Sequence, residues 1–195
     1  MEHENILLVV AVFAVAVSLF VAYSSFGNLL TGHLVATGTV NLSVTTNSQI
    51  NFTVANVNFG AGTVEQGGFV NLITNGTTSG GASWGTVSTP LTVENIGNVN
   101  VTLNISFGKN ADSLIGGTSP LYKYNVSNSE ANSCNVGTSG FGLGVFRDAN
   151  STSTRVCDIF AYDNNLDVIT IDLWIAIPDD PLHTGARGDV ITLTY

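Results

Sequence analysis

The residues best suited to chemistry in this chain of 195 residues are asparagines in the pattern Asn-X-Ser/Thr, the acceptor sequence for N-linked glycans. Seven such sequons are present, at Asn41, Asn51, Asn75, Asn100, Asn104, Asn125 and Asn150. Four of them fall on the polar side of predicted alternating strands, and two fall in predicted loops. A sugar at such positions stays in solvent, so we expect several of the seven to be glycosylated. A polar β-surface composition would produce the same pattern without modification.

The two cysteines, Cys134 and Cys157, are the second chemical feature. An even number of cysteines in an exported chain predicts a disulfide. It would close a loop of about 23 residues and contribute roughly 3 kcal/mol of stability on the chain-entropy model. Two free buried thiols are the alternative.

No constellation of residues predicts catalysis or metal binding. The three histidines are scattered and have no metal-ligand spacing, and they are His3, His33 and His183. Residues 163–167 resemble a calcium loop only faintly, because they lack the glycine and the distal glutamate of an EF-hand. The Arg187-Gly188-Asp189 tripeptide matches an integrin-binding sequence but is explained better by a turn. We therefore expect no enzymatic activity, no metal and no cofactor other than covalent N-glycans.

The charge content narrows the class of protein and its partners. Charged residues make up 10% of the chain, against about 25% in an average soluble domain. Low charge combined with many Thr, Ser and Asn residues is common in secreted β-proteins. The net charge is -9, with only five Lys and Arg residues. Phosphate binding needs clustered cations, so nucleic acid is not expected as a partner.

A long apolar segment near the N-terminus must be explained by any function assigned to the chain. Residues 6–30 contain no charged side chain. As a helix they would span about 37 Å, which is enough to cross a bilayer. Length alone leaves three interpretations open: a secretion signal, a membrane anchor, or a stalk that packs against copies of itself.

The flanks of this segment favour the third interpretation. Glu2 and Glu4 precede it, no Lys or Arg does, and the next Asp, Glu, Lys or Arg is Glu65. Export signals and membrane topology depend on positive charge before the apolar run. One interpretation that reconciles these flanks with export is that a basic leader once preceded Met1 and was cut off, which would make Met1 a mature N-terminus; the sequence leaves this open. Carboxylates in the first turn would then favour the positive end of the helix dipole and could pair with a neighbouring subunit's amine.

The chain resembles the type IV pilin and archaellin superfamily, whose members have a short acidic N-terminus, then an apolar run, then a β-rich head. The resemblance rests on residues 2–30, and the Lys/Arg-Gly processing site of prepilins is not in the sequence. It implies a helix over residues 1–33 that lies in the membrane before assembly and then packs with identical subunits in a filament core. The residues that the resemblance places in this helical core are Glu2, Glu4, Ile6, Val9, Val10, Phe13, Val17 and Phe20.

After residue 38 the hydrophobic pattern alternates, which predicts strands. We expect them at 39–44, 49–54, 69–73, 91–95, 99–107, 122–126, 143–146, 156–162, 168–177 and 189–195. Residues 91–107 read as a hairpin with one buried and one wet face. Their sequence Val-Glu-Asn-Ile-Gly-Asn-Val-Asn-Val-Thr-Leu resembles a hairpin of immunoglobulin-like surface and filament domains. Strands at this spacing favour a two-sheet sandwich with Greek-key connections.

The predicted fold class is therefore mainly β with one long N-terminal hydrophobic α-helix (1–33) and an immunoglobulin-like Greek-key β-sandwich head (34–195). The predicted function is that of a structural subunit of an extracellular, glycosylated, pilus-like filament on an archaeal cell surface, serving adhesion or surface contact. One alternative is a monomeric membrane-anchored surface glycoprotein. Another is a filament in which residues 34–44 of one subunit complete the sheet of the next.

Overall fold

The computed structural model describes residues 11–19, 42–80, 84, 87, 89–137 and 140–195. The chain divides into two compact units, Met1–Val44 and Thr45–Tyr195. Each unit is considered separately below, and the second is called the head.

In the first unit the described secondary structure is a helix over residues 11–19. At 1.5 Å per residue these nine described residues rise about 14 Å, which is about half the thickness of the bilayer core. The prediction of a long N-terminal helix is therefore wrong, and no helix in the described part of the chain is both long and apolar enough to cross a membrane. Val12, Val15 and Val17 are β-branched and lose rotamer freedom in a helix, which weakens helix formation in the absence of packing partners.

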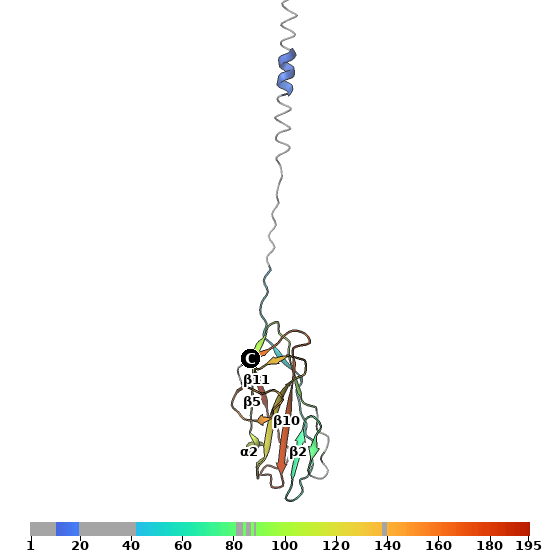
Figure 1. The fold of residues 1–195 in the computed structure, drawn as a ribbon, viewed down its shortest axis with the longest axis vertical. Coiled ribbons are helices and arrows are strands. Elements are labelled where there is room, and N and C mark those ends of the chain that lie inside the picture. Colours follow the sequence, from blue (N-terminus) through green and yellow to red (C-terminus); the bar gives the residue numbers. More distant parts are fainter. Residues whose placement is uncertain (1–10, 20–41, 81–83, 85–86, 88, 138–139) are drawn as a thin grey trace, which may run out of the picture. The chain divides into compact units, whose positions relative to one another are not determined.

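The regular secondary structure of the head is almost entirely β-strand, and loops connect the strands (Figure 1). Their bounds are β1 Ile50–Val54, β2 Phe69–Ile73, β3 Thr78–Ser79, β4 Leu91–Asn95, β5 Val101–Phe107, β6 Leu121–Asn128, β7 Cys134–Asn135, β8 Arg147–Asp148, β9 Thr154–Phe160, β10 Val168–Pro178 and β11 Ile191–Thr194. One helical turn, α2 (Ala111–Leu114), follows β5 and is capped by Asn110, whose side chain accepts a hydrogen bond from the Ser113 amide.

The strands form two antiparallel sheets. The larger is ordered β1-β4-β10-β2-β3, and β6 and then β8 extend it from β10. Residues Ile169–Ile171 of β10 pair with both β4 and β6, so these two strands lie on opposite edges of β10. The smaller sheet is ordered β11-β5-β9-β7. The long strand β10 runs along the middle of the larger sheet and pairs with β2, β4 and β6 (Figure 1).

From β4 onward, successive strands alternate between the two sheets. The even-numbered strands β4, β6, β8 and β10 belong to the larger sheet, and β5, β7, β9 and β11 belong to the smaller one. The hairpin predicted for residues 91–107 is therefore wrong, because β4 pairs with β1 and β10 while β5 pairs with β9 and β11. Nor do the described strands show the immunoglobulin-like arrangement, since only β2 and β3 are both consecutive and paired.

Two shorter predictions also need correction. Of the strand predicted at 39–44, residues 42–44 lie outside any strand, and residues 39–41 are outside the described residues. The strand predicted at 143–146 is displaced, because the extended pair in this region is β8, Arg147–Asp148.

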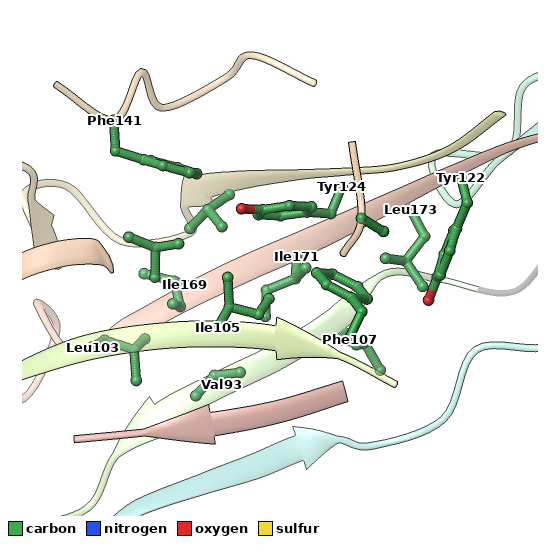
Figure 2. Packing of buried hydrophobic residues seen from close by; sticks show 14 of the residues in the cluster. Val93, Leu103, Ile105, Phe107, Tyr122, Tyr124, Phe141, Ile169, Ile171 and Leu173 are labelled. Atoms are coloured by element: carbon green, nitrogen blue, oxygen red, sulfur yellow. The ribbon is translucent and has the colours of Figure 1, made fainter. Parts of the chain in front are cut away.

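The two sheets bury one continuous apolar cluster between them. Strand β5 alternates buried and half-buried residues along its whole length, and β4 does the same. Val93 from the larger sheet and Leu103 and Ile105 from the smaller one are at most 1% exposed (Figure 2). At one end, Phe107 contacts Tyr122 and Tyr124 with ring centroids 5.4 and 4.8 Å apart. Each fully buried apolar side chain contributes roughly 1.5–3 kcal/mol relative to exposure.

A buried asparagine fixes the crossing from β4 to β5. Asn95 is 1% exposed, and its amide nitrogen donates to the carbonyl oxygens of Val99 and Phe160, both at 3.1 Å. Its side-chain oxygen accepts from the Gly97 amide at 3.1 Å. A Cβ atom at Gly97 would collide with the Asn47 backbone oxygen, so only glycine fits there.

Candidate assembly and modification sites

The helical residues 11–19 present an apolar surface in every direction. All nine are exposed, and Ser18, the only polar member, directs its hydroxyl to the Ala14 carbonyl at 2.7 Å. Phe13 is 70% and Val17 46% exposed. A helix that is apolar all round is usually buried in protein or lipid, so residues 11–19 are a candidate contact surface.

Of the residues predicted to form the assembly core, only Phe13 and Val17 are described. Glu2, Glu4, Ile6, Val9, Val10 and Phe20 lie outside the described residues.

The start of the head is tied to the crossing between β4 and β5. The Asn98 side chain accepts a hydrogen bond from the Asn47 amide at 2.6 Å and donates to the Thr45 carbonyl at 2.9 Å. The Asn98 amide also donates to the Asn47 carbonyl at 2.9 Å. These three bonds anchor the first residues of the head at a fixed point of the β-structure.

Four of the seven sequon asparagines are exposed in the head: Asn51, Asn75, Asn100 and Asn150. Asn104 is half-buried on β5, and its side-chain nitrogen lies 3.5 Å from the Thr194 carbonyl. Asn41 lies outside the described residues. The exposed positions leave room for a glycan, and glycosylation itself stays a prediction.

Asn125 differs from the other sequons because it is only 9% exposed. It lies on β6 opposite Asp172 of β10, and its side-chain oxygen has no hydrogen-bond partner in the described structure. Burial leaves no room for a sugar, which argues against the predicted modification at this position. Alternation did not reveal this, because both faces of β6 are covered over Tyr124, Asn125 and Val126.

The disulfide between Cys134 and Cys157 is present, as the sequence predicted. It joins β7, the edge of the smaller sheet, to its neighbour β9, with the two Cα atoms 5.3 Å apart. Both residues are buried, at 3% and 0% exposure. The bond therefore fastens an edge strand of only two residues to the sheet.

A polar pocket of about 340 Å³ opens where β6, β8 and the start of β9 meet. Its lining residues are Tyr124, Arg147, Asp148, Asn150 and Thr154. Burial raises the pKa of Tyr124, while a hydrogen bond to Thr154 and the nearby Arg147 charge act in the opposite direction. The phenol is therefore neutral at physiological pH and provides a hydroxyl at the pocket wall.

Arg147 holds its guanidinium in place without a carboxylate. Its carbon Cζ lies 4.7 Å from the centre of the Phe141 ring, and Nη2 donates to the Gly140 carbonyl at 3.4 Å. The Nε–H is buried and has no hydrogen-bond partner among the residues that the structure describes. The neighbouring Asp148 pairs instead with Lys123 at 2.8 Å. Sequence reasoning missed this pocket, because no spacing along the chain links residues 124, 147 and 150.

Three other motifs of the sequence remain: the Arg-Gly-Asp tripeptide, the possible metal ligands and the 163–167 loop. The described structure supports no binding site at any of them. Asp189 of the Arg-Gly-Asp tripeptide is engaged with Tyr122, whose pKa is raised by burial and by the Asp189 carboxylate that accepts its hydrogen bond. Within the described ranges, no three His, Cys, Asp or Glu residues are grouped so as to hold a metal ion. In the 163–167 loop, the Leu166 amide donates to the Asp163 carbonyl at 2.7 Å, as in a turn.

Comparison with known proteins gives no family for this chain. No family model matches it, and no curated protein and no solved structure is significantly similar to it.

Proposed function

We propose that the chain is a structural subunit of an extracellular, glycosylated, pilus-like filament, in which the apolar N-terminal segment (residues 6–30) is buried among identical copies and the β-heads face solvent. The observation that carries the proposal is the helix over residues 11–19, with nine exposed residues and no charge. From the pilin resemblance the proposal keeps burial of this segment and does not require a long helix.

The head fits a role on a surface. It has a disulfide, which persists in oxidising compartments, and four exposed sequons. Its polar surface depends on Asn, Thr and Ser more than on charge, and no candidate catalytic site was found among the described residues. Adhesion or surface contact is therefore the role that we propose for the filament.

The competing proposal is a monomeric surface glycoprotein whose apolar segment stays in the membrane. The same exposed side chains favour it, because lipid covers them as well as protein does. In a third arrangement, residues 34–44 of one subunit would complete the sheet of the next. Leu42 and Val44, the described apolar residues of that stretch, are 85% and 77% exposed, which leaves them available for such pairing.

A charge in the apolar segment tests the filament proposal. Val15→Asp should abolish assembly, because burying an unpaired carboxylate among apolar helices costs several kcal/mol per subunit. The measurement is electron microscopy of surface fractions from cells producing the variant. Val145→Asp is the matched control, since Val145 lies in the head at 53% exposure against 58% for Val15. Filaments at normal yield from Val15→Asp would refute burial of this segment in the filament.

A further inference from the structure

We propose that the pocket beside Asn150 holds the first sugar of a glycan linked to that asparagine, and that the Nε–H of Arg147 donates a hydrogen bond to this sugar. Two independent observations meet here. A sequon asparagine lines the pocket, and a buried donor next to it has no partner.

The unpartnered donor suits a ligand that carries an acceptor oxygen. Buried N–H groups nearly always have a hydrogen-bond partner, and a charged group left without one is particularly unfavourable. Arg147 forms no ion pair with any described carboxylate, and its Nη2 contact with Gly140 is long, at 3.4 Å. The stacking on Phe141 holds the guanidinium beside the pocket, and because Nε itself is closed to solvent, a small shift of the Arg147 side chain is needed for an acceptor oxygen in the pocket to reach it.

The conformation of Asn150 suits modification. Its side-chain oxygen accepts from the Thr152 amide at 2.9 Å, and its Nδ2 donates to the Asp148 carbonyl at 3.3 Å. In glycosylation, Nδ2 attacks the anomeric carbon of a lipid-linked glycosyl diphosphate, the C1–Nδ2 bond forms, the diphosphate leaves, and the amide loses one proton. The second Nδ2 hydrogen remains, so one donor is left on Nδ2 for the Asp148 carbonyl.

The size and lining of the pocket match one sugar ring. A volume of about 340 Å³ lies at the small end of ligand sites in proteins. The hydroxyls of Tyr124 and Thr154 both donate and accept, and Asp148 adds an acceptor. Such a wall pairs with sugar hydroxyls from several directions, whereas a purely apolar molecule would leave it unsatisfied.

Asn75 provides the internal comparison. It is an exposed sequon asparagine with the same local bond, because its side-chain oxygen accepts from the Thr77 amide at 2.9 Å. It does not line the pocket. A glycan at Asn75 should therefore extend into solvent without stabilising the head.

The inference requires the export that the proposed function implies, but it does not require assembly. A glycosylated monomer would refute the filament and leave the sugar site standing.

The first test is occupancy. Glycopeptide mass spectrometry of the full chain, isolated from the surface fraction of its native cells, should find a glycan on Asn150. An unmodified Asn150 in that material overturns the proposal.

The second test is coupling between the sugar and Arg147, measured as the thermal unfolding midpoint of glycosylated full-length chains. Asn150→Gln should lower the midpoint by about 3 °C, and Asn75→Gln should not change it. Arg147→Lys keeps the charge but removes Nε. It should lower the midpoint by about 3 °C more in the glycosylated chain than in the Asn150→Gln background. Equal effects in both backgrounds would assign Arg147 a purely structural role and overturn the proposed contact.

Discussion

Residues 11–19 and the head deal with apolar side chains in opposite ways. In the head, residues such as Val93, Leu103 and Phe160 are fully buried between two sheets of the same chain. In the helix, Phe13 and Val15 are more than half exposed. The head is therefore stabilised by its own contacts, whereas in the function that we propose the helix is stabilised by contacts with other copies of the chain. This difference separates mutations that unfold the protein from mutations that disable it while folded.

The largest contrast is expected from a pair of phenylalanine substitutions. Phe160→Ala empties a fully buried position and should reduce the free energy of unfolding of the head by about 3–5 kcal/mol. Phe13→Ala should change it by less than about 0.5 kcal/mol, because Phe13 is exposed in its unit. Both values come from urea unfolding in mild detergent followed by tryptophan fluorescence, since both tryptophans lie in the head. A comparable loss from Phe13→Ala would show that the two regions are not independent.

Removing the disulfide should have the next largest effect, again confined to the head. The double variant Cys134→Ala/Cys157→Ala loses a cross-link over a separation of 23 residues and should be destabilised by about 3 kcal/mol. A reducing agent should destabilise the native chain by a similar amount and leave the double variant unchanged. At temperatures where the head of the double variant is folded, filaments should still form, because the disulfide stabilises the head and takes no part in assembly. Loss of filaments at those temperatures would contradict this separation of roles.

A smaller effect is expected at the crossing between the sheets. Asn95→Ala removes three side-chain hydrogen bonds in the interior and should destabilise the head by about 1–3 kcal/mol. Asn135→Ala is the matched control, because Asn135 is exposed and its side-chain oxygen accepts a local hydrogen bond from the Gly137 amide at 2.8 Å. The difference in urea midpoint between the two variants measures what burial of the polar group contributes. Equal midpoints would mean that the crossing is not held by Asn95.

These elements also show what the sequence could and could not predict. The hydrophobic pattern correctly located β1, β2, β4, β5 and β10, because each of these strands packs apolar side chains against the core. It could not tell a hairpin from a crossing between sheets, since β4 and β5 alternate identically in both cases. The deciding features are the burial of Asn95 and the close approach of Gly97 to Asn47. Both depend on contacts between residues that are far apart in the sequence.

The disulfide and the sequons show the same limit of what can be predicted from sequence. An even number of cysteines was enough to predict the disulfide. The accessibility of a sequon, in contrast, depends on which parts of the fold cover it. Asn125 and Asn150 share the same motif, yet one is buried opposite Asp172 and the other lines an open polar pocket. The N-terminal helix was overestimated because hydrophobicity gives the length of an apolar run and not the length of the helix within it.

The smallest effect concerns pH and is also expected in the head alone. The pKa of Asp167 is raised by burial and by the neighbouring Glu130 and Glu94 carboxylates. A carboxyl whose folded-state pKa lies above its unfolded value binds protons more tightly when folded, so its contribution to stability falls as pH rises through the folded pKa. Asp167→Asn should therefore raise the urea midpoint at pH 7 and leave it nearly unchanged near pH 3. A lower midpoint at pH 7 would contradict this effect.

The central claim is that the apolar residues 11–19 are buried against other copies of the chain. A photo-crosslinking amino acid in place of Phe13, activated in intact cells, tests it most directly, and the same substitution at Tyr162 in the head, 46% exposed, controls for collisions. The filament proposal predicts crosslinked dimers and higher multimers of this chain from position 13, in the filament fraction. Crosslinks from position 13 to lipid alone, with the chain remaining monomeric, would contradict it.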